Sequence, residues 1–277
     1  MLAAMLLAGA LPAAAALSVE RIALHQFEDG PVLPETHVFL PGEPIFFSCR
    51  LMGFQTEAAK EEQKAVKLSW KVQVTDPSGA ALAREASGTI ADLVSTMDKN
   101  WLPKFLHNFT VPPFVASGTY HIQVSVKDEV GKTQLESSFD FAVRGHAVEP
   151  SATLAGRNLH FLRTESDGPP LDPVVYHPGE TLWARFDMTG YKFGEKNRYS
   201  VEYGLAVLRE SGEQVFAQPA AAADSNEAFY PQRYVPGALS LQLNPDVPAG
   251  TYTLLVTMAD KIGAQMAEVR GNFRIEK

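Results

Sequence analysis

The amino-acid sequence predicts an all-β protein made of two tandem antiparallel β-sandwich domains of immunoglobulin-like class. Three observations lead to this prediction. Several segments alternate between apolar and polar residues, turn residues separate them at short intervals, and the whole arrangement occurs twice in the chain. Many short alternating strands with frequent turns and little helical periodicity are typical of antiparallel sandwiches.

The alternation is clearest in the stretch VKLSWKVQVT, residues 66–75, where apolar side chains occupy every second position. The segment 201–207 repeats this phase in the second half of the chain, and the segments 45–51 and 182–188 alternate in the same way. Because successive side chains of a strand point to opposite faces, each segment is predicted to be a strand with one buried face. A short helix is expected only near residues 91–102.

The repeat is clearest in two segments of 26 residues. The segment 118–143, GTYHIQVSVKDEVGKTQLESSFDFAV, aligns without a gap with 250–275, GTYTLLVTMADKIGAQMAEVRGNFRI, and eight positions are identical. Each segment is predicted to be a hairpin that turns at 127–132 or 259–264, where an Asp begins the turn and a Gly ends it. The chain therefore holds two copies of one module, with a period too long for a solenoid repeat.

The predicted organisation has four parts. Residues 1–16 resemble a signal peptide, because an uncharged apolar run ends in alanines that suit a cleavage site. The first sandwich is expected over 17–143, a linker over 144–156 and the second sandwich over 157–277. We expect export to the periplasm or the extracellular space, followed by cleavage and no stable membrane insertion. An uncleaved anchor is the alternative, although the run is short and weakly apolar for one.

Turn and strand motifs recur at matching places in the two copies. The first copy carries PGE at 41–43, DPSG at 76–79 and GTY at 118–120, and the second keeps PGE at 178–180 and GTY at 250–252. This pattern resembles the macroglobulin-type sandwich domains of the α2-macroglobulin superfamily. The resemblance implies a fold class and not protease trapping, because nothing in the chain matches the reactive thioester segment of that family.

Charge and cysteine content exclude several classes of protein. The net charge of −8 and the isoelectric point of about 5.4 give no basic footprint, so no nucleic-acid partner is expected. The single cysteine, Cys49, cannot form an intramolecular disulfide. Cys49 lies at an apolar position of its predicted strand and corresponds to Phe186 in the second copy, so we expect a small buried hydrophobic side chain there.

The sequence shows no pattern typical of catalysis, cofactor binding or metal binding. A Gly-rich phosphate loop, a G-x-S-x-G elbow and an HExxH helix are all missing, and no His lies at ligand spacing from another His or Cys. His25, close to Glu28 and Asp29, comes nearest to a cluster. Four aspartates occur beside glycines at corresponding places in the two copies, where turn stabilisation is the expected role: Asp29, Asp128, Asp167 and Asp260.

Aromatic residues outside the alternating faces are the candidate partner-binding residues, because aromatics in loops often anchor partners. Two follow a polar stretch of the first copy, and three lie in the second copy after a segment of alanines that is expected to be a loop. They are Trp101, Phe105, Phe229, Tyr230 and Tyr234. The alternative is that each long loop folds back and caps its own sandwich.

These observations favour an exported non-enzymatic protein that mediates protein interaction or envelope scaffolding. The expected partner is another envelope or extracellular protein. A carbohydrate-binding accessory protein is the first alternative, since the loop aromatics suit a glycan. A periplasmic assembly chaperone shares the plan of two sandwiches, and an enzyme whose site lies on the sandwich loops is the least favoured alternative.

Overall fold

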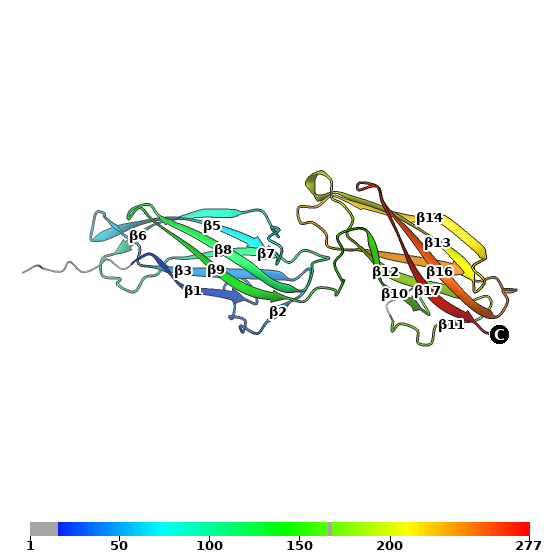
Figure 1. Cartoon of the computed structure of the whole chain (residues 1–277). Coiled ribbons are helices and arrows are strands. Elements are labelled where there is room, and N and C mark those ends of the chain that lie inside the picture. Colours follow the sequence, from blue (N-terminus) through cyan, green and yellow to red (C-terminus); the bar gives the residue numbers. More distant parts are fainter. Residues whose placement is uncertain (1–15, 166–167) are drawn as a thin grey trace, which may run out of the picture. The chain divides into compact units, whose positions relative to one another are not determined.

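The computed structural model describes residues 16–165 and 168–277 and confirms the predicted all-β fold (Figure 1). Strands of the described residues form four sheets, two in each sandwich-like domain. The one helical element among them is the 3-10 turn Glu195–Asn197. Contacts divide the chain into two compact units, which hold most of the residues before and after position 143 respectively. The predicted signal peptide and Asp167 lie outside the described residues, apart from Ala16.

The N-terminal sandwich consists of a sheet of three strands and a sheet of six. The smaller sheet has the order β1-β3-β7, and the larger has the order β2-β9-β8-β5-β4 with β6 also paired to β5. The strands are β1 (Ser18–His25), β2 (Val38–Phe39), β3 (Pro44–Met52), β4 (Glu57–Ala58), β5 (Gln63–Thr75), β6 (Ala86–Ser95), β7 (Lys104–Thr110), β8 (Gly118–Asp128) and β9 (Thr133–Val143).

The C-terminal sandwich repeats this plan. Its smaller sheet has the order β10-β12-β15, and its larger sheet has the order β11-β17-β16-β13-β14. The strands are β10 (Ala155–Leu162), β11 (Val175–Tyr176), β12 (Thr181–Thr189), β13 (Tyr199–Arg209), β14 (Gln214–Asn226), β15 (Val235–Gln242), β16 (Gly250–Asp260) and β17 (Gln265–Ile275). The strands that contain the predicted repeat, β8 with β9 and β16 with β17, are neighbours in both copies.

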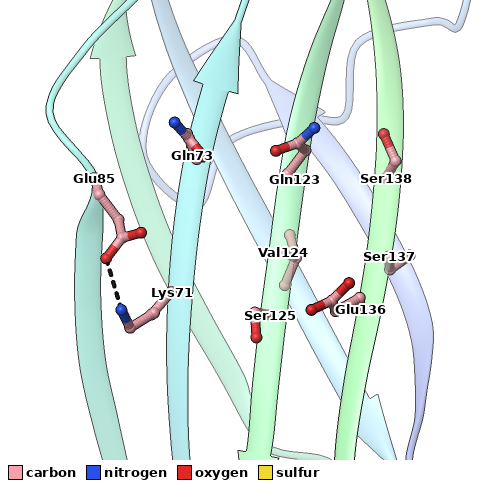
Figure 2. Close-up of a pocket in the computed structure, with 9 residues that line it drawn as sticks. All are labelled: Lys71, Gln73, Glu85, Gln123, Val124, Ser125, Glu136, Ser137 and Ser138. Carbon is pink, nitrogen blue, oxygen red and sulfur yellow. Dashed lines mark hydrogen bonds and ion pairs between the residues drawn. The ribbon is translucent and has the colours of Figure 1, made fainter. Parts of the chain in front are cut away.

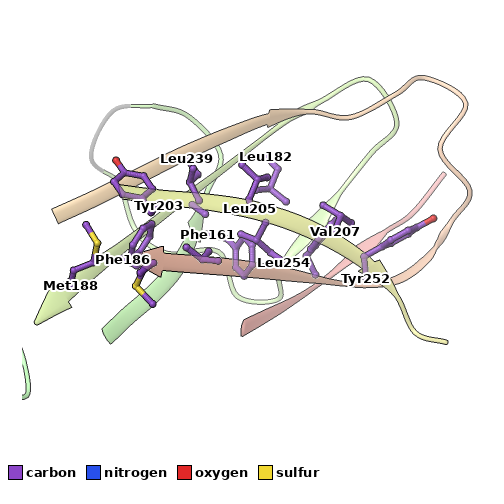
Figure 3. Packing of buried hydrophobic residues seen from close by; sticks show 14 of the residues in the cluster. Phe161, Leu182, Phe186, Met188, Tyr203, Leu205, Val207, Leu239, Tyr252 and Leu254 are labelled. Carbon is purple, nitrogen blue, oxygen red and sulfur yellow. The ribbon is translucent and has the colours of Figure 1, made fainter. Parts of the chain in front are cut away.

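Each core lies between the apolar faces of the two sheets. In the N-terminal sandwich the ring of Trp70 on β5 stacks on that of Phe105 on β7, with 4.4 Å between the ring centroids. In the C-terminal sandwich the ring of Phe186 on β12 meets that of Tyr203 on β13 edge to face at 5.2 Å. Figure 3 shows the second core, in which side chains from both sheets interdigitate. The period-2 alternation of the sequence thus becomes burial of one face of strands such as β5 and β16.

The prediction of a short helix near residues 91–102 is wrong. Residues up to Ser95 belong to β6, which pairs with β5 in an unbroken antiparallel register of ten residues. The structure leaves Leu93 and Met97 of this stretch exposed. Ile90 and Val94 are buried instead, and a spacing of four suits one face of a strand as well as one face of a helix. Pairing with β5 therefore decides the local structure.

The repeated hairpins form as predicted, and a buried aspartate organises each turn. Oδ1 of Asp260 accepts hydrogen bonds from the backbone N–H of Ile262 (2.9 Å) and Gly263 (3.0 Å), while Oδ2 accepts one from the N–H of Lys192 (2.8 Å). Asp128 does the same in the first copy, where its second oxygen accepts from the N–H of Gln55 (2.7 Å). Each carboxylate thus closes its turn and also holds a loop from another part of its own sandwich.

Burial alone would raise the pKa of Asp260, because a charged group loses solvation inside a protein. The backbone N–H groups of Gly263, Lys192 and Ile262, together with the Gln265 amide, outweigh burial and hold the pKa below its ordinary value. An aspartate with a lowered pKa in the folded state stabilises that state above its unfolded pKa. This stabilisation disappears as the pH falls through the folded pKa.

The substitution Asp260→Asn should therefore destabilise the C-terminal sandwich at neutral pH by about 1–3 kcal/mol, since charge-assisted hydrogen bonds are lost. Urea unfolding followed by fluorescence measures this, because Trp183 is the one tryptophan of the second sandwich. The difference from the unsubstituted protein should shrink below about pH 4, near the unfolded pKa of Asp. Asp246→Asn, at an exposed carboxylate, is the control and should change little. A pH-independent difference would contradict the role assigned to the carboxylate.

Candidate functional site

Three of the five aromatic residues predicted to bind a partner are buried, which corrects the prediction that they are accessible. Phe105 lies in the first core against Trp70. Tyr230 and Tyr234 are buried in the C-terminal sandwich, where the Gln232 amide donates a hydrogen bond to the carbonyl of Tyr234 (2.8 Å). The loop that carries both tyrosines is held to Tyr191 of the second copy, whose hydroxyl donates a hydrogen bond to the carbonyl of Gln232 (2.6 Å).

Trp101 and Phe229 remain candidates for partner binding. Trp101 is half-buried and meets Phe54 edge to face, with 6.1 Å between ring centroids. The two rings line a cavity of about 340 Å³ that also includes Met52 and Lys99. Phe229 is exposed in the C-terminal sandwich. The surroundings of Trp101 and Phe229 neither support nor contradict partner binding, so their assignment as binding residues stays a prediction.

A polar hollow of about 440 Å³ lies on the outer face of the larger N-terminal sheet, and Figure 2 shows its lining. We call it the sheet-face groove. Strands β5, β8 and β9 and the residue preceding β6 supply its side chains, which are Lys71, Gln73, Glu85, Gln123, Val124, Ser125, Glu136, Ser137 and Ser138. Its one pair of charged partners is Lys71 and Glu85, whose Nζ and Oε1 atoms lie 2.9 Å apart.

The sheet-face groove offers hydrogen-bond donors and acceptors but no aromatic side chain. Lys71 and Glu85 are both exposed, so their ion pair contributes little to stability. The groove therefore suits a hydrated polar ligand or a polar protein surface.

The larger sheet of the C-terminal sandwich ends in a long exposed edge strand, β14. The sequence interpretation placed a loop at its alanines, which is wrong, because residues 214–226 form a strand that pairs with β13 on both sides of a bulge. Among the described residues, β14 has a partner strand on one side only. Its first ten residues, QVFAQPAAAA, carry no charge. Val215 and Phe216 are adjacent and mostly alanines follow them, so apolar and polar residues do not alternate clearly. The sequence therefore does not reveal this strand without its neighbour β13.

A bulge divides β14 into two pairing segments. The register with β13 jumps between Tyr203, opposite Ala222, and Leu205, opposite Gln218. At the jump, a Cβ atom on Gly204 would lie 2.1 Å from the carbonyl oxygen of Pro219, so this close approach of two backbones requires glycine. The segments 214–218 and 222–226 are therefore separate stretches of free strand edge.

A pocket of about 370 Å³, lined mostly by apolar side chains but also by Arg209 and Asp246, opens beside the first of these segments. It lies between the edge strands of the two sheets of the C-terminal sandwich, because β14 supplies Val215 and Phe216 and β15 supplies Leu241. The loop after β15 adds Val247 and Pro248. We call this the edge pocket. A free strand edge and an apolar pocket thus lie together on one domain.

The described residues contain no group of three or more His, Cys, Asp or Glu side chains placed to hold a metal ion. Cys49 is fully buried, as its counterpart Phe186 predicts, and burial raises the pKa of its thiol to about 12. The thiol is therefore protonated and shielded at neutral pH, which suits the predicted role as a small buried hydrophobic side chain.

Comparisons with known proteins add little. No family model matches the chain, and no curated protein matches it. A solved structure that resembles it is the C-terminal domain of the Streptococcus agalactiae AgI/II polypeptide BspA, with 9% sequence identity over 92% of this chain and 99% of that one. The TM-score is 0.28, so the likeness carries no argument about function. The resemblance to macroglobulin-type domains stays a prediction. No helix in the described part of the chain is long and apolar enough to cross a membrane.

Cys49 should resist thiol reagents while the protein is folded. We expect negligible reaction with 5,5′-dithiobis(2-nitrobenzoic acid) at pH 8, because the pKa of the thiol lies near 12 and the residue is fully buried. Full labelling should follow in denaturing urea. The variant Ser87→Cys, with a thiol at an exposed position of β6, is the matched control and should gain one reactive site. Reaction of native Cys49 within minutes would show that the strand opens or that the thiol is activated.

Proposed function

We propose that the protein is an exported, non-enzymatic interaction or scaffolding module that binds an extended segment of another envelope or extracellular protein along β14. One observation carries the proposal: a thirteen-residue edge strand without charge in its first ten positions. Free strand edges present unpaired N–H and C=O groups, which a strand from another chain can pair with.

The edge of β14 has only part of the protection that natural edge strands carry. Natural edges are blocked by charged side chains, especially Lys, by Pro or by bulges. β14 has Pro219 and its bulge but no Lys, and its first charged residue is Asp224. Residues 214–218 stay in regular register with β13 before the bulge, except next to the turn. This segment is therefore the better template for an added strand.

The edge pocket can give the specificity that backbone pairing alone does not give. In strand addition, main-chain hydrogen bonds give affinity and pockets for alternate side chains give specificity. Phe216 is 40% exposed and lines the edge pocket together with Leu241 and Val247. We infer that the partner segment pairs with 214–218 and inserts an apolar side chain into the edge pocket.

An assembly chaperone is the second candidate, because donor-strand pairing of subunits would use the same free edge. The two functions differ in the state of the partner. A chaperone client lacks a strand and does not fold stably alone, whereas a partner of an interaction module is folded before binding. The glycan alternative loses its main support, since Tyr230 and Tyr234 are buried. The non-enzymatic assignment rests on the lack of catalytic motifs in the sequence.

The proposal is tested by site-specific photo-crosslinking in the source envelope. A benzoylphenylalanine at position 218, on the edge of β14, should capture one protein, whereas the same group at position 134 on β9 should not. The captured segment should be extended and apolar when mapped by mass spectrometry. Capture from both positions alike, or from neither, would contradict binding along β14.

Once the partner segment is identified, Phe216→Lys should weaken its binding at least tenfold in biolayer interferometry, because it places a charge in the edge pocket. Met266→Lys is the matched control. Met266 is an 80% exposed apolar residue of the same sheet, on β17, which β16 and β13 separate from β14. Equal binding by the two variants would exclude the edge pocket. Stable folding of the purified partner by itself would exclude the chaperone function.

A further inference from the structure

Three basic side chains lie side by side on the outer face of the smaller N-terminal sheet. In the strand registers, Arg21 on β1 is directly opposite Arg50 on β3, and Arg50 is directly opposite Lys104 on β7. We call these three residues the cationic row. Like charges directly opposite one another on a sheet destabilise it. A row of three in a chain with a net charge of −8 therefore breaks a local rule of stability.

The C-terminal sandwich shows how the same position is built without this conflict. The offset of 137 residues between the two PGE motifs places Asp187 where the first copy has Arg50. Asp187 is opposite Arg157 on β10 and opposite Pro236 on β15, so no like charges face each other. The Asp187 carboxylate also accepts a hydrogen bond from the Asn158 amide at 2.7 Å. The fold itself therefore does not require the cationic row.

The cationic row borders a pocket of about 200 Å³, and all three of its side chains line that pocket. Lys104 is paired with Asp29, which also lines the pocket. Neither guanidinium, of Arg21 or of Arg50, has a hydrogen bond or an ion pair with any residue in the described ranges 16–165 and 168–277. Three positive charges against the one carboxylate of Asp29 leave an excess of two. Glu28 lines the small adjoining cavity instead.

The floor of the pocket holds a polar pair with a fixed orientation. His25 Nδ1 lies 2.8 Å from the carbonyl oxygen of Gly30, so this nitrogen carries a hydrogen and donates it. Nε2 of the neutral ring is then an acceptor, and it lies 2.8 Å from Ser48 Oγ, whose hydroxyl donates to it. Ser48 is only 6% exposed.

We propose that this pocket binds an oxyanion group, that is a carboxylate, sulfate or phosphate, carried by a ligand of the protein. Guanidinium groups bind such groups through paired, charge-assisted hydrogen bonds, which would offset the repulsion within the cationic row. The pocket is smaller than the usual range of about 300–1,000 Å³ for drug-sized ligands, so it suits one such group. The site is independent of the binding proposed along β14.

The test is a titration of the ¹⁵N-labelled full chain by NMR with sodium sulfate, phosphate and acetate. Sodium chloride keeps the ionic strength constant, so that general screening is held fixed. Saturable shifts of the backbone signals of residues 21–30, 48–50 and 104 are expected, and the anion with the lowest Kd identifies the preferred group. A linear response without saturation to all three anions would overturn the proposal.

Two variants assign the binding to the cationic row. Arg50→Gln should raise the Kd at least tenfold, whereas Lys71→Gln, which removes the same charge from the sheet-face groove, should leave it within twofold. If Arg50→Gln does not fold, Arg21→Gln tests the same row at an exposed position of β1. An equal Kd for the row variant and the unsubstituted protein would overturn the proposal, as would an equal loss in Lys71→Gln.

A stability measurement separates binding from a purely structural role. Without a multivalent anion, Arg50→Gln should unfold at the same temperature as the unsubstituted protein or higher, because repulsion is relieved. Saturating anion should raise the unfolding temperature of the unsubstituted protein but not of Arg50→Gln. A variant that is less stable in chloride alone and that still gains stability from the anion would show that the cationic row has only a structural role.

Discussion

The fold depends on the burial of one apolar face by the inner strands of each sandwich, such as β5 and β16. Since strand side chains alternate in direction, this requirement fixes every second residue and leaves the others free. The stacking of Trp70 on Phe105 and the contact of Phe186 with Tyr203 are the points where two sheets meet under that constraint. Burial does not specify the residues of the outer faces, the strand edges and the loops. The candidate sites lie in these places.

The sequence predicts well those parts of the fold that local chemistry decides. The alternation over residues 66–75 predicts a strand, and the aspartates at 128 and 260 predict turns, because each signal lies within a few residues. Strand β14 was missed because its alanines and Pro219 have weak strand propensity, so that pairing with β13 holds it in place. The burial of Tyr230 and Tyr234 depends on how a loop returns to its sandwich, which local sequence does not encode. The cationic row was missed for a related reason, since Arg21, Arg50 and Lys104 become neighbours only through strand register.

The two copies diverge at the places that the common fold does not fix. They share the hairpin aspartates, which hold the turn and a second loop in both sandwiches. They differ in their edge strands, because β6 pairs with β5 in unbroken register and carries Asp92, whereas β14 is longer, bulged and uncharged over most of its length. They differ also at the position where Arg50 corresponds to Asp187. The two copies thus share residues that build the sandwich and differ on their outer surfaces.

The differences between the two copies separate features that the fold requires from features that it does not require. A feature required by the fold should appear in both copies, as the buried aspartates do. A row of like charges costs stability, and one sandwich of this chain forms without it, so packing does not account for its presence in the other. The same reasoning applies to β14, since β6 shows that the fold accepts an edge strand with a charged residue, Asp92. The two domains, built from one module, therefore present different chemistry: an oxyanion pocket on the first and a free strand edge with an apolar pocket on the second.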